Sequence, residues 1–105
     1  MVAPDDLKKI VLFDVGPVGP FRGRDTWNGF YGRVRNDLPR SVEKIGLKAS
    51  FYNAEEELIE VRTFWMNVPS ALPNTPVSFE SNVSVDHLPY QWRYELEVTE
   101  AHYVK

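Results

Sequence analysis

Apolar and polar residues alternate along much of this chain, which predicts β-strands because successive side chains of a strand point to opposite faces of its sheet. The clearest run spans residues 92–98, where apolar residues alternate with charged ones: Trp92, Tyr94, Leu96 and Val98 against Arg93, Glu95 and Glu97. The same period of two occurs over residues 45–51 and 59–65. We therefore predict three strands, each with one face in a core and the other in solvent.

Weaker alternation predicts further strands over residues 30–34, 77–85 and 7–15. Turn-forming residues separate these runs and include most of the eight prolines, which lack the N–H that a strand ladder needs. Six or seven short strands with regular turns are typical of a sandwich. The expected fold class is all-β: a single-domain antiparallel immunoglobulin-like β-sandwich over residues 1–105, in which residues 1–6 form a disordered N-terminus.

Residues 54–66 have a rival prediction, because Ala-Glu-Glu-Glu-Leu at the start of this segment has a high helix propensity. We favour a strand, since Ile59, Val61 and Thr63 are β-branched and alternate with polar residues. The residues between the two alternating runs then form a hairpin connection, in which a short helical turn near Glu55 is compatible with the strand.

The alternation also assigns the side chains that face the core. This expected core consists of Phe30, Val34, Ile45, Leu47, Phe51, Val61, Trp65, Phe79, Trp92, Tyr94, Leu96 and Val98.

The composition narrows the class of protein further. Of the 105 residues, 43% are hydrophobic and 26% are charged, which is ordinary for a globular domain and excludes a wholly disordered chain. With no cysteine, a disulfide framework, thiol catalysis and cysteine-ligated zinc are excluded. No apolar run approaches the roughly 18 residues of a membrane span, so we expect no membrane insertion of this chain.

The layout of residues 29–98 resembles the FxLYD family. The likeness rests on the strand with Gly-Phe-Tyr-Gly at residues 29–32, the aromatic strand end and asparagine at residues 51–53, and Leu-Pro-Asn-Thr-Pro-Val-Ser-Phe at residues 72–79. The motif that names the family would fall on residues 49–53, where alanine, phenylalanine and asparagine replace its phenylalanine, leucine and aspartate. The resemblance implies a small immunoglobulin-like module of prokaryotic cell-envelope or secreted proteins, without catalytic residues.

Residues able to carry chemistry are few. The chain has two histidines, His87 and His102, and neither stands in a metal-ligand spacing with other ligands. The run Glu55, Glu56 and Glu57 is expected in a solvated turn, where a carboxylate does not acquire the raised pKa of a general acid. No nucleophile elbow or phosphate-binding loop occurs, so we predict no catalytic residue, no metal ligand and no cofactor.

One set of residues suggests a binding surface. If Phe30 and Val34 face the core, then Tyr31, Arg33 and Arg35 share the outer face of the same strand, and Trp27 lies shortly before them. Aromatic and guanidinium groups together suit stacking and anion contacts. The simpler interpretation is a solvated strand face whose charges discourage edge pairing.

We therefore predict a non-enzymatic binding or spacer module whose partner is another protein, in contact with Tyr31, Arg33, Arg35 and Trp27 or with an adjacent strand edge. The net charge of −3 argues against a nucleic-acid partner. An alternative is a module that binds carbohydrate or another planar ligand through exposed aromatic residues. A third hypothesis is a small enzyme with an unrecognised site.

Overall fold

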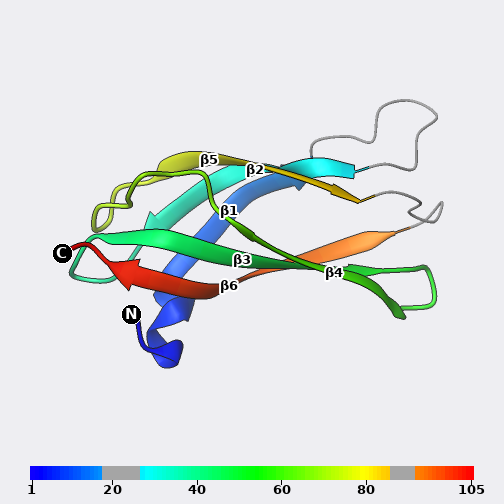
Figure 1. Cartoon of the computed structure of the whole chain (residues 1–105), viewed down its shortest axis with the longest axis horizontal. Coiled ribbons are helices and arrows are strands. Elements are labelled where there is room, and N and C mark those ends of the chain that lie inside the picture. The colour runs from blue at the N-terminus through cyan, green and yellow to red at the C-terminus, as the bar shows by residue number, and fades with distance from the viewer. Residues whose placement is uncertain (18–26, 86–91) are drawn as a thin grey trace.

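Two three-stranded antiparallel sheets pack face to face in this protein (Figure 1). The structure, a computed structural model, describes residues 1–17, 27–85 and 92–105. The elements are the 3-10 helix η1 (Pro4–Lys9) and the strands β1 (Ile10–Pro17), β2 (Trp27–Asn36), β3 (Val42–Tyr52), β4 (Leu58–Trp65), β5 (Val77–Val85) and β6 (Arg93–Tyr103). One sheet has the order β1-β2-β5 and the other β4-β3-β6, which confirms the all-β antiparallel sandwich.

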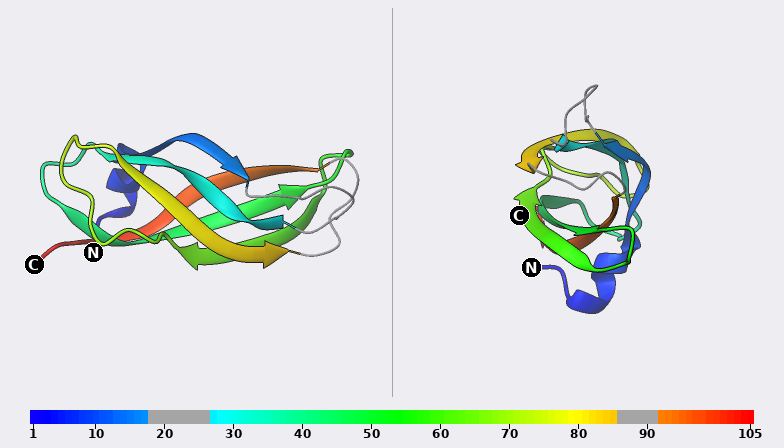
Figure 2. Two further views of the ribbon diagram at one scale, coloured as in Figure 1. Left: turned by 90° about the horizontal axis from the view of Figure 1, so that it is seen from above. Right: turned by 90° about the vertical axis from the view of Figure 1, so that its right-hand side faces the viewer.

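The chain changes sheets three times, between β2 and β3, between β4 and β5, and between β5 and β6, and β2 and β3 are the central strands of their sheets. The end view in Figure 2 shows the two sheets as separate layers. The buried side chains of the core lie between them. Strands β4 and β6 lie at the edges of one sheet, and β1 and β5 at the edges of the other. This arrangement explains which side chains are buried: the central strands supply most of the core.

An aromatic cluster forms one half of the core. Phe30 of β2 and Phe51 of β3 are fully buried, and their ring centroids lie 6.4 Å apart. Phe30 also packs against Tyr94 at 4.6 Å, and Phe51 against Trp92 at 5.8 Å. The six predicted core residues on β2, β3 and β5 are all buried: Phe30, Val34, Ile45, Leu47, Phe51 and Phe79.

The N-terminal residues are ordered, so the predicted disorder of residues 1–6 is wrong. Val2 is buried, and its N–H donates to the carbonyl of Ala101 in β6 at 2.9 Å. Pro4 then opens helix η1, where its fixed φ suits a first helical turn. The apolar side chain of Leu7 packs against the core from this helix. The terminal segment was misjudged because a single buried valine has no periodicity that a pattern analysis detects.

Strand β4 confirms the predicted strand over residues 59–65 but presents its other face to the core. Val61 and Trp65, both expected to be buried, are 41% and 59% exposed, whereas Phe64 packs inward opposite Leu47. A β-bulge causes the exchange: Tyr52 lies opposite Leu58, yet Phe51 lies opposite Glu60. This shift of one residue turns every following side chain of β4 to the opposite face.

The inward-facing residues of β6 are only half-buried, although the sequence placed them in the core. Trp92, just before the strand, and Tyr94 and Leu96 within it pack against the aromatic cluster, and Val98 packs against the other half of the core. They keep some exposure because β6 is an edge strand, with a neighbour on one side only.

Asn36, at the end of β2, is a fully buried polar residue with a complete set of hydrogen bonds. Its Nδ2 donates to the carbonyls of Arg40 and Ala71 at 2.8 and 2.9 Å. Its Oδ1 accepts from the N–H of Leu38 at 2.9 Å, and its backbone carbonyl accepts from Asn74 at 2.7 Å. One side chain thereby joins the turn after β2 to the segment that leads into β5.

The hairpin between β3 and β4 is held by a second asparagine. Asn53 accepts the N–H groups of Glu55 and Glu57 on its Oδ1 at 3.0 and 2.9 Å, and Glu56 has a positive φ of 64°. The turn is exposed and contains no helix, so the predicted hairpin is confirmed and the helical alternative for residues 54–66 is wrong.

Candidate functional site

The residues that the sequence singled out lie on the outer face of β2, the central strand of its sheet. Tyr31 is 52% exposed, Arg33 is exposed and Arg35 is half-buried, as the alternation predicts. Trp27 begins the same strand, but its side chain lies outside the described residues. The structure thus brings Tyr31, Arg33 and Arg35 together on one surface, while their role in binding stays a prediction.

Intramolecular contacts use the guanidinium groups of this face. Arg35 forms a bidentate pair with Asp37, at 2.7 Å from Nε to Oδ1 and 2.9 Å from Nη2 to Oδ2. The Arg33 guanidinium lies 5.2 Å from the ring centroid of Phe13, a cation–π contact with the neighbouring strand β1. Because Asp37 neutralises Arg35, the face is less basic than its sequence indicates.

The hydrogen bonds from Arg35 hold the pKa of the Asp37 carboxyl below its usual range. We expect Arg35→Gln to return this pKa toward the ordinary aspartate value, as measured by NMR titration of the carboxyl carbon. A lowered pKa means that the pair stabilises the fold above the unfolded pKa, near 4, and that this contribution is lost as the pH falls through the folded value. An unchanged pKa in the variant would contradict the pair, and Arg33→Gln is the matched control.

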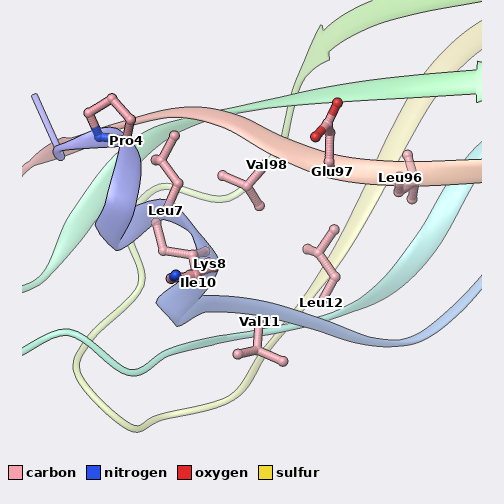
Figure 3. Close-up of a pocket in the computed structure, with 9 residues that line it drawn as sticks. All are labelled: Pro4, Leu7, Lys8, Ile10, Val11, Leu12, Leu96, Glu97 and Val98. Atoms are coloured by element: carbon pink, nitrogen blue, oxygen red, sulfur yellow. The ribbon is translucent and has the colours of Figure 1, made fainter.

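An open groove lies between β6 and the segment formed by helix η1 and β1 (Figure 3). It has a volume of about 580 Å³. Leu7, Leu12, Leu96 and Val98 line it with apolar side chains, and Figure 3 shows these between the two segments. Lys8 and Glu97 supply its charged groups. The groove is therefore the place where the edge strands β1 and β6 leave apolar side chains of the core accessible to solvent.

Most of the described titratable groups with shifted pKa values lie in exposed ion pairs, whereas Tyr94, whose pKa is raised by burial, does not. On the outer face of the β4-β3-β6 sheet, Arg93 stacks on Tyr52 at 4.1 Å and contacts both Glu56 and Glu95. The hydrogen bond from Arg93 lowers the pKa of Glu56, because the ionised carboxylate is the better acceptor. Ion pairs of this kind, in contact with water, add little to stability and activate no group for catalysis.

The two histidines do not form a site in the described part of the chain. His102 is half-buried, with Nε2 at 2.7 Å from Glu100 Oε2, and His87 lies outside the described residues. Within residues 1–17, 27–85 and 92–105, no three metal-ligating side chains come together. No helix in these ranges has the length and apolar character to cross a membrane.

The surface that sequence analysis missed is a stripe of exposed apolar side chains along β4. The β4 stripe consists of Leu58, Ile59, Val61 and Trp65, which are 40–59% exposed. Across the sheet, Val61 lies opposite Ser50, Thr63 opposite Lys48, and Trp65 opposite Gly46, whose missing side chain leaves room for the indole. Further in, Lys48 pairs with Glu97 at 2.6 Å, so a charged surface borders the stripe.

Part of the signal for this stripe is in the sequence, because the alternation identified Ile59, Val61 and Trp65, and Val61 and Trp65 were assigned to the core. The β-bulge at Ile59 decides which face of the sheet these side chains take. The residues of this hairpin contain no pattern that predicts a bulge.

Comparisons with known proteins bear on the fold alone. No family model matches the sequence, and no curated protein matches it. A solved structure, described as the X-ray structure of Northeast Structural Genomics Consortium target SoR45, is similar, with a TM-score of 0.52 and 10% sequence identity. The similarity covers 90% of this chain and 85% of that chain, so the same arrangement of strands extends over nearly the whole domain.

Proposed function

We propose that this protein is a non-enzymatic binding module that acts by contact with another protein. The β4 stripe is the observation that carries the proposal. Soluble monomers rarely leave neighbouring large apolar side chains in water, and such groups mark interaction surfaces when polar residues surround them. Trp65, at 59% exposed, is the residue type most enriched among those that dominate binding energy.

The surroundings of the stripe also suit a protein contact. Lys48 borders it on β3, and Glu95 and Glu97 lie one strand further away on β6, which gives an apolar surface with a charged rim on one side. The free edge of β4 adds backbone groups that a partner strand can pair with.

The proposal extends to the kind of module. An immunoglobulin-like sandwich of the FxLYD type, in a prokaryotic cell-envelope or secreted protein, is consistent with two antiparallel sheets whose chain crosses between them after β2, β4 and β5. Such modules serve as binding or spacer units, and the close approach of the two ends at Val2 and Ala101 allows further domains to join at one pole.

Two other hypotheses find less support. A module that binds planar ligands needs several exposed rings in a row. Trp92 instead packs on Phe51 in the core, and the Arg33 guanidinium covers the ring of Phe13. Tyr31 is then an exposed ring on the outer face of β2 without a second ring beside it among these residues. An enzyme needs titratable groups that converge in a cavity, and the groups with shifted pKa values here are mostly in surface ion pairs.

Site-specific photo-crosslinking tests the proposal. A photoreactive amino acid replaces Trp65 in the β4 stripe or, as the control, Glu80, which is exposed on the outer face of the other sheet opposite Tyr31. After irradiation in cells that carry the gene, mass spectrometry identifies the adducts. We expect a defined protein adduct from position 65 and none from position 80, because an apolar anchor contacts its partner directly.

Adducts from position 80 alone would contradict the assignment and move the contact to the face of Tyr31, Arg33 and Arg35. Diffuse adducts of equal yield at both positions would contradict a specific protein contact altogether.

A further inference from the structure

We propose that the partner of the β4 edge is a second copy of this chain, whose β4 strand pairs with it antiparallel about a two-fold axis at Val61. The inference rests on the proposed function and names its partner. Three observations carry it: the orientation of the backbone groups of β4, the placement of its charges, and the exposed stripe.

The backbone N–H and C=O groups on the free edge of β4 are oriented so that a further strand can pair with them. In the described part of the chain, β3 is the one strand that pairs with β4. Met66 donates its N–H to Ile45 of β3 at 2.8 Å, so beyond the bulge the even-numbered residues Glu60, Arg62 and Phe64 are the ones whose backbone groups point toward β3. Val61 therefore points its N–H and C=O away from β3. That N–H is occupied by the carboxylate of Glu60 of the same chain at 3.2 Å, an acceptor that a partner strand can replace.

Charge complementarity selects one pairing. With the axis at Val61, Val61 of one copy lies opposite Val61 of the other, and Glu60 of each copy lies opposite Arg62 of its partner. An axis at residue 60 or 62 would instead set two glutamates or two arginines against each other. An axis at 59 or 63 would leave a charge opposite an apolar residue, Leu58 or Phe64. The pairing centred on Val61 is the one that matches both charges.

The charges also explain why an arbitrary strand would not bind here. Glu60 and Arg62 lie on the core side of an edge strand, where charged side chains discourage pairing because they lose water when covered. They are 37% and 48% exposed, and Arg62 Nε lies 3.6 Å from Glu60 Oε1 within the chain. A second β4 places an opposite charge of the partner against each of them, whereas a strand of another sequence does not.

The exposed stripe gains cover in the same arrangement. On the outer face of the joined sheet, the two Val61 side chains meet at the axis, and Ile59 lies opposite Thr63 of the partner. Trp65 then lies on the diagonal from the partner's Ile59, within reach of its large ring. The three-stranded β4-β3-β6 sheets of the two copies then form one continuous six-stranded sheet with the two β4 strands at its centre.

Charge exchange and measurement of oligomeric state test the pairing. The wild type is expected to be a dimer by sedimentation at micromolar concentrations. Glu60→Arg and Arg62→Glu each set like charges opposite one another and are expected to raise the dimer dissociation constant by about tenfold or more. The double variant exchanges the two charges and is expected to restore the dimer. Glu55→Arg, with the same change of charge in the exposed hairpin turn, is the control and is expected to remain dimeric.

A backbone variant tests the pairing without a change of charge. Val61→Pro removes an N–H that does not bond to β3, so the ladder between β3 and β4 is retained while the partner strand loses a donor. We expect a monomer with the circular dichroism spectrum of the wild type.

A wild-type protein that stays monomeric up to hundreds of micromolar would overturn the pairing. So would a dimer whose dissociation constant is unchanged in both single charge variants. If the charge variants are unfolded, a dimeric and folded Val61→Pro protein overturns it equally. The cross-linking at position 65 separates the two proposals: an adduct to a different protein leaves the proposed function standing and removes the second copy as the partner.

Discussion

Replacing Phe51 by alanine is expected to lower the free energy of unfolding by about 3 to 5 kcal/mol, because the truncation removes a buried ring and leaves a cavity. Phe51 is fully buried on the central strand β3, between Phe30 and Trp92. Phe30 cannot move into the space easily, since it is itself buried and packed against Phe64 and Tyr94. Urea unfolding followed by tryptophan fluorescence measures the loss.

Trp65→Ala is the matched control, since it removes a larger ring from a residue that the sequence also assigned to the core. Trp65 is 59% exposed, so we expect a loss of about 1 kcal/mol or less. Both proteins are compared at a concentration below that of dimer formation, because the stripe is expected to be covered in the dimer. Equal losses at positions 51 and 65 would show that β4 has its alternating residues inside.

The contrast between these two residues shows how far the sequence determines the fold. The period of two places strands correctly, and on the central strands it also identifies the buried face, because one face of β3 carries Ile45, Leu47 and Phe51 and the other carries Lys48. On β4 both faces contain apolar residues, and the hairpin register decides between them. Had the pairing of Tyr52 with Leu58 continued without a bulge, Val61 would face the core as predicted.

For the candidate site, the sequence predicted only which face of β2 its side chains occupy. Alternation sufficed to place Tyr31, Arg33 and Arg35 on an outer face. The pairing of Arg35 with Asp37 depends instead on the path of the turn after β2, and the contact of Arg33 with Phe13 depends on the register of β1 against β2. These features come from tertiary structure, so the sequence overstated the positive charge of this face.

Asn36 is the polar residue with the largest expected effect on stability, because it is fully buried and hydrogen-bonded. Asn36→Ala is expected to destabilise the protein by about 1 to 3 kcal/mol, since the buried N–H of Leu38 loses its acceptor. The carbonyl of Ala71 loses one donor but keeps the N–H of Val42 at 3.1 Å. Alanine cannot reproduce these bonds, and the site is fully buried, so bulk water cannot replace them. Thermal and urea unfolding measure the effect.

Asn53→Ala provides the comparison that isolates burial as the cause. Asn53 also holds a turn with its Oδ1, on the N–H groups of Glu55 and Glu57, but these groups are exposed and water takes the place of the lost acceptor. We expect a loss of about 1 kcal/mol or less there. A loss at position 36 no greater than that at position 53 would show that water reaches the turn after β2, and that the link from this turn to the segment before β5 adds little to the stability of the sandwich.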